Sequence, residues 1–178
     1  SDGLLVKKGG YLFPKLICQE MTSHPNIKII FNHCFHKWSK KEGKLDIEFS
    51  NQKRKSNYDD LIIANGPSLE EILSGLKISK GQLVGLKGEQ SIDLDLPLNS
   101  AGYILPKVNN ITWIGSSHEK EYKDLNICYD VGKGLLKRID KNFKIKLNGT
   151  SNMLMEARLR TGSKDRLPLA GKIEENVY

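Results

Sequence analysis

The chain has 178 residues, of which 38% are hydrophobic and 28% are charged, and a formal net charge of +7 at pH 7. This length suits one domain, or one domain with part of a second, and the composition supports a packed core while excluding wholesale disorder. No apolar run approaches the roughly 18 residues that cross a bilayer, so no membrane partner is expected.

Three cysteines, Cys18, Cys34 and Cys128, are scattered along the chain without a CxxC motif. They are too few for a disulfide scaffold and therefore predict buried thiols in a reduced, cytoplasmic protein. His33, Cys34 and His36 lie close together, but on a strand His33 points away from the other two. Core packing is therefore expected there, and no metal site.

A helix and then a β-meander are predicted for the N-terminal part of the chain. Pro14 is tolerated in the first turn of a helix, and Ser-His-Pro at 23–25 ends it. Leu45, Ile47 and Phe49 alternate with acidic residues, which predicts a half-buried strand. The strands expected in this region are 27–31, 33–39 and 45–49.

The next predicted strand, 58–64, has a different character. Its second half, Leu61-Ile62-Ile63-Ala64, is apolar on both faces. Continuous apolar runs of this length are typical of strands that are buried in a parallel sheet. The strand rises to a turn at Asn65-Gly66-Pro67, where we expect it to end.

From Ser68 onward the pattern changes to a helix followed by strands. Ser68 caps a short helix that has carboxylates in its first turn. Residues 121–143 form the longest helical candidate, because apolar side chains recur there every three or four residues. Further strands are expected at 82–86, 101–106, 111–115 and 153–159.

The basic side chains form three clusters, at 37–44, 53–55 and 133–144. Solvated loops and an exposed helix face explain each cluster taken alone. No known nucleic-acid-binding motif accompanies these clusters. The charge therefore permits a phosphate-rich or otherwise acidic partner without identifying one.

Two arginines near the C-terminal end suggest a binding function. Arg158 and Arg160 are two positions apart on a predicted strand, so their side chains share a face. Guanidinium is well suited to bidentate binding of a carboxylate. A surface ion pair between an arginine and Glu156 is the competing explanation.

The order and spacing of several motifs resemble the D-amino-acid-oxidase-type FAD-dependent oxidoreductases, the family that contains glycine oxidase and sarcosine oxidase. The resemblance covers nearly the whole chain, and each motif alone is weak whereas their ordered combination is fairly specific. The motifs are Gly9-Gly10-Tyr11 with Pro14, the turn at Ala64-Asn65-Gly66, Lys87-Gly88-Glu89, Gly102-Tyr103-Ile104-Leu105-Pro106, Ile114-Gly115-Ser116 and the stretch from Leu159 to Gly171.

This resemblance implies an α+β fold, a fragment of a two-domain FAD oxidoreductase. The fragment would contain an antiparallel substrate-domain sheet with helices, plus a β-meander and one strand of the FAD-binding domain. Residues 1–67 would be part of the FAD-binding domain, residues 68–160 the substrate domain, and residues 161–178 a return toward the FAD domain.

The family's N-terminal GxGxxG unit, which holds the FAD pyrophosphate, is not in this sequence. The segment that closes the family's flavin site is not in it either. We therefore expect an internal fragment whose missing partner is the remainder of the same polypeptide. Alone, this piece is expected to bind FAD poorly and to be inactive.

The resemblance also implies roles for individual residues. Arg160 would hold the substrate carboxylate, with Arg158 as a second candidate, and Tyr103 would hydrogen-bond that carboxylate or cover the flavin. Phe35 would offer its backbone to the adenine, and Ala64-Asn65-Gly66 would pack near the ADP half of FAD. The chain departs from the family pattern at Thr161 and Arg166, where proline and glycine are usual.

Within the family, the chain most resembles the oxidoreductase half of the bifunctional tRNA 5-methylaminomethyl-2-thiouridine biosynthesis proteins. That branch oxidises the carboxymethylaminomethyl group of a tRNA wobble uridine, so tRNA would be a partner, and a basic protein is compatible with it. The motifs that favour this branch are the segments at 9–14, 61–66, 114–117, 156–158 and 165–168.

Two alternatives remain open at this point. A small-molecule amino-acid or amine oxidase, or a dehydrogenase, of the same fold would use the same arginine and flavin without any tRNA. A non-catalytic basic module that binds RNA or protein would explain the charge and the absent GxGxxG unit. Under that explanation the ordered combination of motifs would be a coincidence.

Overall fold

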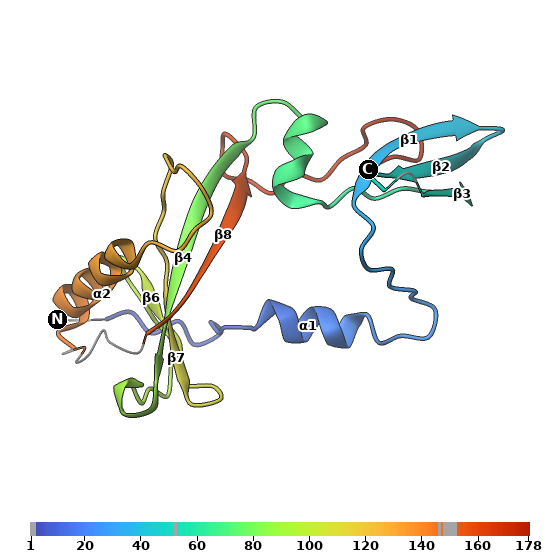
Figure 1. Cartoon of the computed structure of the whole chain (residues 1–178). Helices are drawn as coiled ribbons and strands as arrows, with labels where there is room; N and C mark the ends of the chain where they lie inside the picture. The colour runs from blue at the N-terminus through green and yellow to red at the C-terminus, as the bar shows by residue number, and fades with distance from the viewer. Residues whose placement is uncertain (1–2, 52, 146, 148–152) are drawn as a thin grey trace. The chain divides into compact units, whose positions relative to one another are not determined.

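The structure, a computed structural model, describes residues 3–51, 53–145, 147 and 153–178. The chain divides into two compact units. Unit 1 comprises residues 1–13 and 78–160, and unit 2 comprises residues 14–77 and 161–178. Each unit contains a β-sheet together with helical segments (Figure 1), so the predicted α+β class is confirmed.

Unit 1 is built on a five-stranded sheet with the strand order β5-β6-β7-β4-β8. The long strand β4 (Lys77–Lys87) pairs antiparallel with β7 (Ile111–Gly115). β7 in turn pairs with β6 (Tyr103–Ile104), and β6 with β5 (Leu98–Asn99), both antiparallel. β8 (Leu154–Gly162) lies on the other side of β4.

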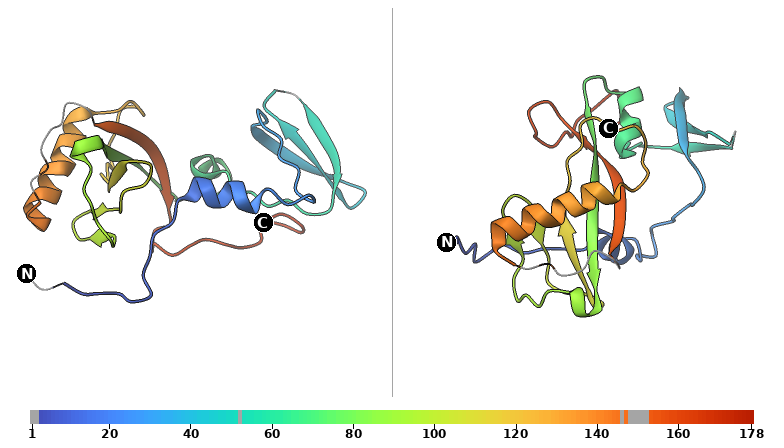
Figure 2. Two further views of the ribbon diagram at one scale, coloured as in Figure 1. Left: turned by 90° about the horizontal axis from the view of Figure 1, so that it is seen from below. Right: turned by 60° about the vertical axis from the view of Figure 1, so that its left-hand side comes forward.

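The helix α2 (Tyr129–Phe143) packs across one face of this sheet (Figures 1 and 2). Its apolar positions recur at helical spacing and meet the alternate residues of the strands that point the same way. Burying each of these aliphatic side chains stabilises unit 1 by about 1.5–3 kcal/mol. The core cluster consists of Val84, Leu86, Ile104, Ile114, Leu135, Leu136, Ile139 and Met153.

The predicted helix at 121–143 was too long, because residues 121–128 form turns instead. The carboxylate of Asp124 accepts hydrogen bonds from the backbone and side-chain nitrogens of Asn126, each at 2.8 Å. Such local bonds compete with helix formation. The backbone N–H of Cys128 then donates to Oε1 of Gln82 at 2.8 Å, and the helix begins at the next residue.

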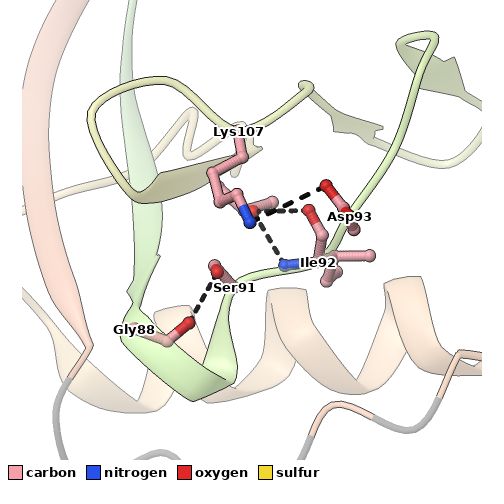
Figure 3. Close-up of polar contacts among 6 residues, drawn as sticks. Gly88, Ser91, Ile92, Asp93 and Lys107 are labelled. Atoms are coloured by element: carbon pink, nitrogen blue, oxygen red, sulfur yellow. Dashed lines mark hydrogen bonds and ion pairs between the residues drawn. The ribbon is translucent and has the colours of Figure 1, made fainter.

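The segment that follows β4 is anchored to β7 by a buried threonine. Oγ1 of Thr112, which is fully buried, accepts from the backbone N–H of Ile92 at 2.8 Å and donates to its carbonyl at 3.1 Å. Ser91 donates to the carbonyl of Gly88 at 2.6 Å, and Lys107 lies 3.7 Å from Asp93 (Figure 3). These contacts fix the Lys-Gly-Glu segment, which forms the short helix η2 (Gly88–Gln90).

Unit 2 contains a three-stranded antiparallel meander in the order β1-β2-β3, which confirms two of the predicted strands and has an unpredicted third strand at 54–58 in place of 27–31. Its strands are β1 (Phe35–Lys41), β2 (Lys44–Phe49) and β3 (Arg54–Tyr58). The helical segments of unit 2 are α1 (Pro14–Met21) and η1 (Gly66–Glu71).

Two predicted strands of unit 2 are wrong or much reduced. Residues 27–31 are not in a strand, and residues 58–64 keep only a parallel bridge between Leu61 and Val177. Leu61 and Ile63 bond the backbone of the C-terminal residues, with Ile63 N–H donating to the Tyr178 carbonyl at 2.8 Å. Both faces of a strand are buried only where other elements cover them, and Ile62 is 76% exposed.

The structure also differs from the prediction for the cysteines of both units and for the core of unit 2. The three cysteines are free and exposed, so the prediction of buried thiols is wrong. α1 has no buried residue, which leaves Cys18 in solvent with the rest of that helix. The ring of His33 packs edge-on against Phe49 at 5.0 Å, whereas Cys34 and His36 are exposed.

No helix in the described part of the chain is long and apolar enough to cross a membrane. The described residues likewise contain no group of three or more His, Cys, Asp or Glu side chains that could hold a metal ion.

Candidate functional site

The candidate site lies on the face of the unit 1 sheet that is turned away from α2. Because directly paired residues point to the same face, the register places Tyr103, Gly115 and Leu83 in one row across three strands. Their neighbours in sequence, Ile104 and Val84, point into the core against α2. The strands therefore hold an aromatic hydroxyl and an aliphatic side chain on the face opposite the helix.

Several glycines lie on this face of the sheet and let larger side chains lie close to the backbone. A Cβ on Gly81 would be 2.9 Å from Nε of Arg160, and one on Gly85 would be 3.1 Å from the ring of Trp113. Such approaches are tighter than ordinary Cβ contacts, so a larger residue at either position would displace the side chain that lies over it.

Gly115 has the closest neighbour of all. A Cβ there would overlap the ring of Tyr103 and would approach Cδ2 of Leu83 to 2.7 Å. The aromatic ring thus rests directly on the backbone of β7. This packing fixes where the Tyr103 hydroxyl lies on the sheet.

Arg160 reaches the same region from β8. Its Nη2 donates to Oγ of Ser116, the residue that follows β7. Among the described residues, no carboxylate forms an ion pair with Arg160. A guanidinium that is held by a neutral hydroxyl keeps its charge and several donors for a ligand.

Tyr103 and Arg160 influence each other electrostatically. Burial raises the pKa of the Tyr103 phenol above its ordinary value, and the positive charge of Arg160 opposes this rise by stabilising the phenolate. The phenol therefore stays protonated at neutral pH and can donate a hydrogen bond. The structure thus brings together two of the three predicted substrate-binding residues.

We predict that the variant Arg160→Gln has a higher Tyr103 pKa than the wild type. Removing the guanidinium removes the interaction that favours the phenolate, so only the effect of burial remains. Ultraviolet difference titration measures the pKa, and the band that disappears in Tyr103→Phe identifies this tyrosine. An unchanged or lower Tyr103 pKa in Arg160→Gln would show that the two groups are not close.

Arg158, the third predicted substrate-binding residue, shares the strand face with Arg160 but has other contacts. Its Nη1 donates to the carbonyl of Ala157 at 2.9 Å, and its Nη2 lies 3.9 Å from Glu156. The ion pair with Glu156 considered in the sequence analysis is therefore present, on an exposed surface where such pairs contribute little. A role for Arg158 in substrate binding stays a prediction.

A buried network next to the site holds the segment after β7. The backbone N–H of Gln82, a residue that is 1% exposed, donates to Oγ of Ser117 at 2.8 Å. Ser117 donates to Oε1 of Glu119 at 2.6 Å, and Nε2 of Gln82 donates to the same oxygen at 3.0 Å. This network fixes the chain immediately after Ser116, whose hydroxyl binds Arg160.

Sequence analysis did not identify Ser116, Gly81 or Trp113 as parts of the site. The sequence offered two signals. Gly81 and Gly85 are four positions apart and so share one face of β4, and Trp113 is an aromatic residue within β7. Neither pattern alone distinguishes a ligand site from ordinary sheet packing.

The residues predicted to bind FAD lie in unit 2. Phe35 begins β1 and its ring stacks on Trp38, with centroids 6.0 Å apart and planes 24° from parallel. Oδ1 of Asn65 is buried and has no hydrogen-bond partner among the described residues. Gly66 has φ +61° and open space where a Cβ would be. A buried acceptor without a partner fits a group that donates a hydrogen bond, such as a ribose hydroxyl.

The stretch that follows β8, from Ser163 onward, bends back on itself in unit 2. Ser163 donates to the carbonyl of Leu167 at 2.7 Å, and the Leu167 N–H donates to Asp165 at 3.1 Å. Arg166 has φ +68°, the left-handed conformation in which glycine carries no steric cost. This explains physically why glycine is the usual residue at that position of the family motif.

No family model matches the sequence. The chain is 28% identical over 181 residues to the tRNA 5-methylaminomethyl-2-thiouridine biosynthesis bifunctional protein MnmC of Campylobacter jejuni. That alignment covers 97% of this chain and 28% of the relative, so the chain spans little more than a quarter of the relative's length.

Solved structures of two oxidases share the fold. Glycine oxidase from Geobacillus kaustophilus matches with a TM-score of 0.60 and 17% identity, over 80% of this chain and 40% of that one. Iminodiacetate oxidase from Chelativorans matches with a TM-score of 0.60 and 16% identity, over 82% of this chain and 42% of that one. The resemblance predicted from the motifs is therefore confirmed: the chain is homologous to part of MnmC and has part of the glycine-oxidase fold.

Proposed function

We propose that the protein is an FAD-dependent oxidoreductase that oxidises a carbon–nitrogen bond next to a carboxylate-bearing amine. The observation that carries this proposal is the position of Arg160. Its guanidinium lies beside the Ser116 hydroxyl and near Tyr103, on a sheet face that contains several glycines. It has no acidic partner in the described part of the chain. This arrangement suits a substrate carboxylate, which would supply the missing negative charge.

The names of the similar proteins support one substrate class. Glycine and iminodiacetate both contain an amine joined through one methylene to a carboxylate, and they name the two oxidases of similar fold. The carboxymethylaminomethyl group of a wobble uridine contains the same unit. We therefore propose a carboxymethylamine as the reacting group, carried by a tRNA wobble uridine as the MnmC homology suggests.

The residues of this chain would divide the work between binding and orientation. Arg160 would bind the carboxylate through two parallel N–H donors, and the protonated Tyr103 would donate to the same group. Fixing the carboxylate at one end places the adjacent methylene at a defined position, which lowers the entropic cost of reaction. Leu83 and Trp113, both half-buried on the same face, would exclude water from around the methylene.

FAD would be held in part by unit 2, where Asn65 offers a buried acceptor, Gly66 leaves space and Phe35 and Ala64 complete the predicted set. When bound, FAD supplies the two-electron oxidant for the carbon–nitrogen bond, and water then cleaves the resulting imine to an amine and glyoxylate. In this proposal unit 2 is part of the FAD-binding domain and unit 1 is the substrate domain. A cytoplasmic location, where modified tRNA is available, belongs to the same proposal.

The test uses the purified protein with its natural flanking sequence and compares its activity on different substrates. Iminodiacetate, glycine and tRNA bearing the carboxymethylaminomethyl group are each incubated with the protein, and glyoxylate is measured. Glyoxylate is expected from the carboxylate-bearing substrates, and fastest from the tRNA. An amine that lacks the carboxylate cannot form glyoxylate, so its turnover is followed as flavin reduction, and a rate equal to that of iminodiacetate would contradict the role given to Arg160.

The small-molecule alternative is favoured by the fold likeness to oxidases of free amino acids. In that case the free amino acids would be oxidised efficiently, and the tRNA would not react. The same assay therefore separates the two substrates. A protein that yields no glyoxylate from any of them would favour the non-catalytic binding module.

A further inference from the structure

We propose that the outer face of α2 is a docking surface for the phosphate backbone of the RNA. This α2 basic face consists of Lys137, Arg138, Lys141 and Lys144. The inference rests on the proposed function, because it gives the RNA partner of the same site a surface to bind. It identifies residues that neither the substrate carboxylate nor FAD would contact.

The helix geometry gathers these cations on one side. Lys137 and Lys141 are four positions apart and therefore neighbours on one side of the helix, and Lys144 is the left-handed residue that ends it. All four members of the α2 basic face are exposed, while Leu135, Leu136 and Ile139 are buried against the sheet. Cations with a rise of about 6 Å per step along a helix suit a chain of phosphates.

The acidic residues of the helix leave this face positively charged. Asp130 lies 3.6 Å from Lys133, one turn before the α2 basic face, and Asp140 is the other acid in the helix. Within the described residues, no ion pair involves Lys137, Arg138, Lys141 or Lys144. The charge of the face is therefore available to an external partner.

The two basic clusters of unit 2 are different, because four of their cations are paired within the protein. Ion pairs join Lys37 to Glu48 at 3.5 Å and Arg54 to Asp46 at 2.8 Å. Lys40 pairs with Glu175, and Lys44 with Asp59. Lys41, Lys53 and Lys55 of unit 2 have no ion pair among the described residues either, but they lie in separate turns and strands, whereas the cations of the α2 basic face are gathered along one helix and at its end.

The helix dipole explains only part of this pattern. Cations are favoured in the last turn of a helix, which accounts for Lys141 and Lys144. Lys137 and Arg138 lie before the last turn. Gly134, one turn before Arg138, has no atom within 4 Å of its Cβ position, so the helix backbone is open to close approach there.

Arg138 connects the α2 basic face to the candidate site. Its Nη2 donates to the carbonyl of Ser116 at 3.2 Å, and the hydroxyl of the same serine accepts from Arg160. Arg138 thus links the α2 basic face to Ser116 at the end of β7, although the sheet face that carries Arg160 is turned away from α2.

The test measures RNA binding by the full protein with the triple variant Lys137→Gln, Lys141→Gln and Lys144→Gln. Affinity for a fluorescent anticodon stem-loop RNA is expected to fall about tenfold near 0.1 M salt, and the slope of log affinity against log salt to decrease by about 2. The matched control, Lys28→Gln, Lys41→Gln and Lys53→Gln, removes the same charge from exposed positions of unit 2 and is expected to change affinity less than twofold.

Equal losses in both triple variants would overturn the proposal, because they would indicate binding through net charge alone. A wild type that binds polyglutamate but not the RNA would overturn it in favour of a protein partner. A second measurement needs no variant: bound RNA is expected to protect Lys137, Lys141 and Lys144 from acetylation more than Lys41 and Lys53. Because binding is measured without turnover, glyoxylate formation from iminodiacetate tests the proposed chemistry separately.

Discussion

Replacing Arg160 with glutamine is expected to reduce kcat/KM for a carboxylate-bearing amine by roughly 30- to 1,000-fold, which corresponds to about 2–4 kcal/mol. The guanidinium is the group that would supply charge and two parallel donors to the carboxylate. Ser116 and the backbone at Gly81 hold this guanidinium against the sheet, so a nearby lysine cannot take its place. Steady-state kinetics with iminodiacetate measure the loss.

One further substrate and one further variant show whether the loss of kcat/KM depends on the substrate carboxylate. An amine without a carboxylate should react equally slowly with the wild type and with Arg160→Gln. Lys41→Gln, which removes one positive charge from an exposed turn of unit 2, serves as a control for net charge. An Arg160→Gln protein with wild-type kcat/KM for iminodiacetate would remove Arg160 from the proposed mechanism.

Replacing Gly115 with alanine is expected to destabilise unit 1 by about 1–3 kcal/mol and to displace Tyr103. The added methyl group would occupy the position of the Tyr103 ring and press against Leu83. Either the ring or the strand must move, because β7 is held on both sides by its partner strands. Urea denaturation followed through Trp113 fluorescence, in a Trp38→Phe background, reports on unit 1.

The same substitution at Gly134 is the matched control. Gly134 lies within α2 and has open space at its Cβ position, so alanine there should stabilise the helix by up to about 1 kcal/mol. The two variants therefore change stability in opposite directions although each adds one methyl group. A Gly115→Ala protein as stable as the wild type would mean that Tyr103 does not rest on β7.

Several parts of the fold and site were predictable because their signals are local. The strand at 111–115 and the β-strand face shared by Arg158 and Arg160 follow from alternation, which depends only on neighbouring residues. Tyr103 and Arg160 came from motifs whose spacing along the chain is characteristic of a family. The structure then placed these two residues near each other.

The remaining features depend on contacts between distant residues. The helix starts at Tyr129 because Gln82, 46 residues before Cys128, binds the Cys128 N–H. Ser116 becomes part of the site only because Arg160, 44 residues away, reaches its hydroxyl. Residues 27–31 have a strand-like sequence, but without a partner strand their apolar side chains stay exposed.

The central claim is most directly tested by the visible absorption spectrum of the purified protein, with its natural flanking sequence, before and after anaerobic addition of iminodiacetate. We predict a flavin spectrum that bleaches when the substrate is added, whereas residues 1–178 alone should bind FAD poorly. A folded protein that stays colourless after incubation with FAD would contradict the account and favour a basic binding module.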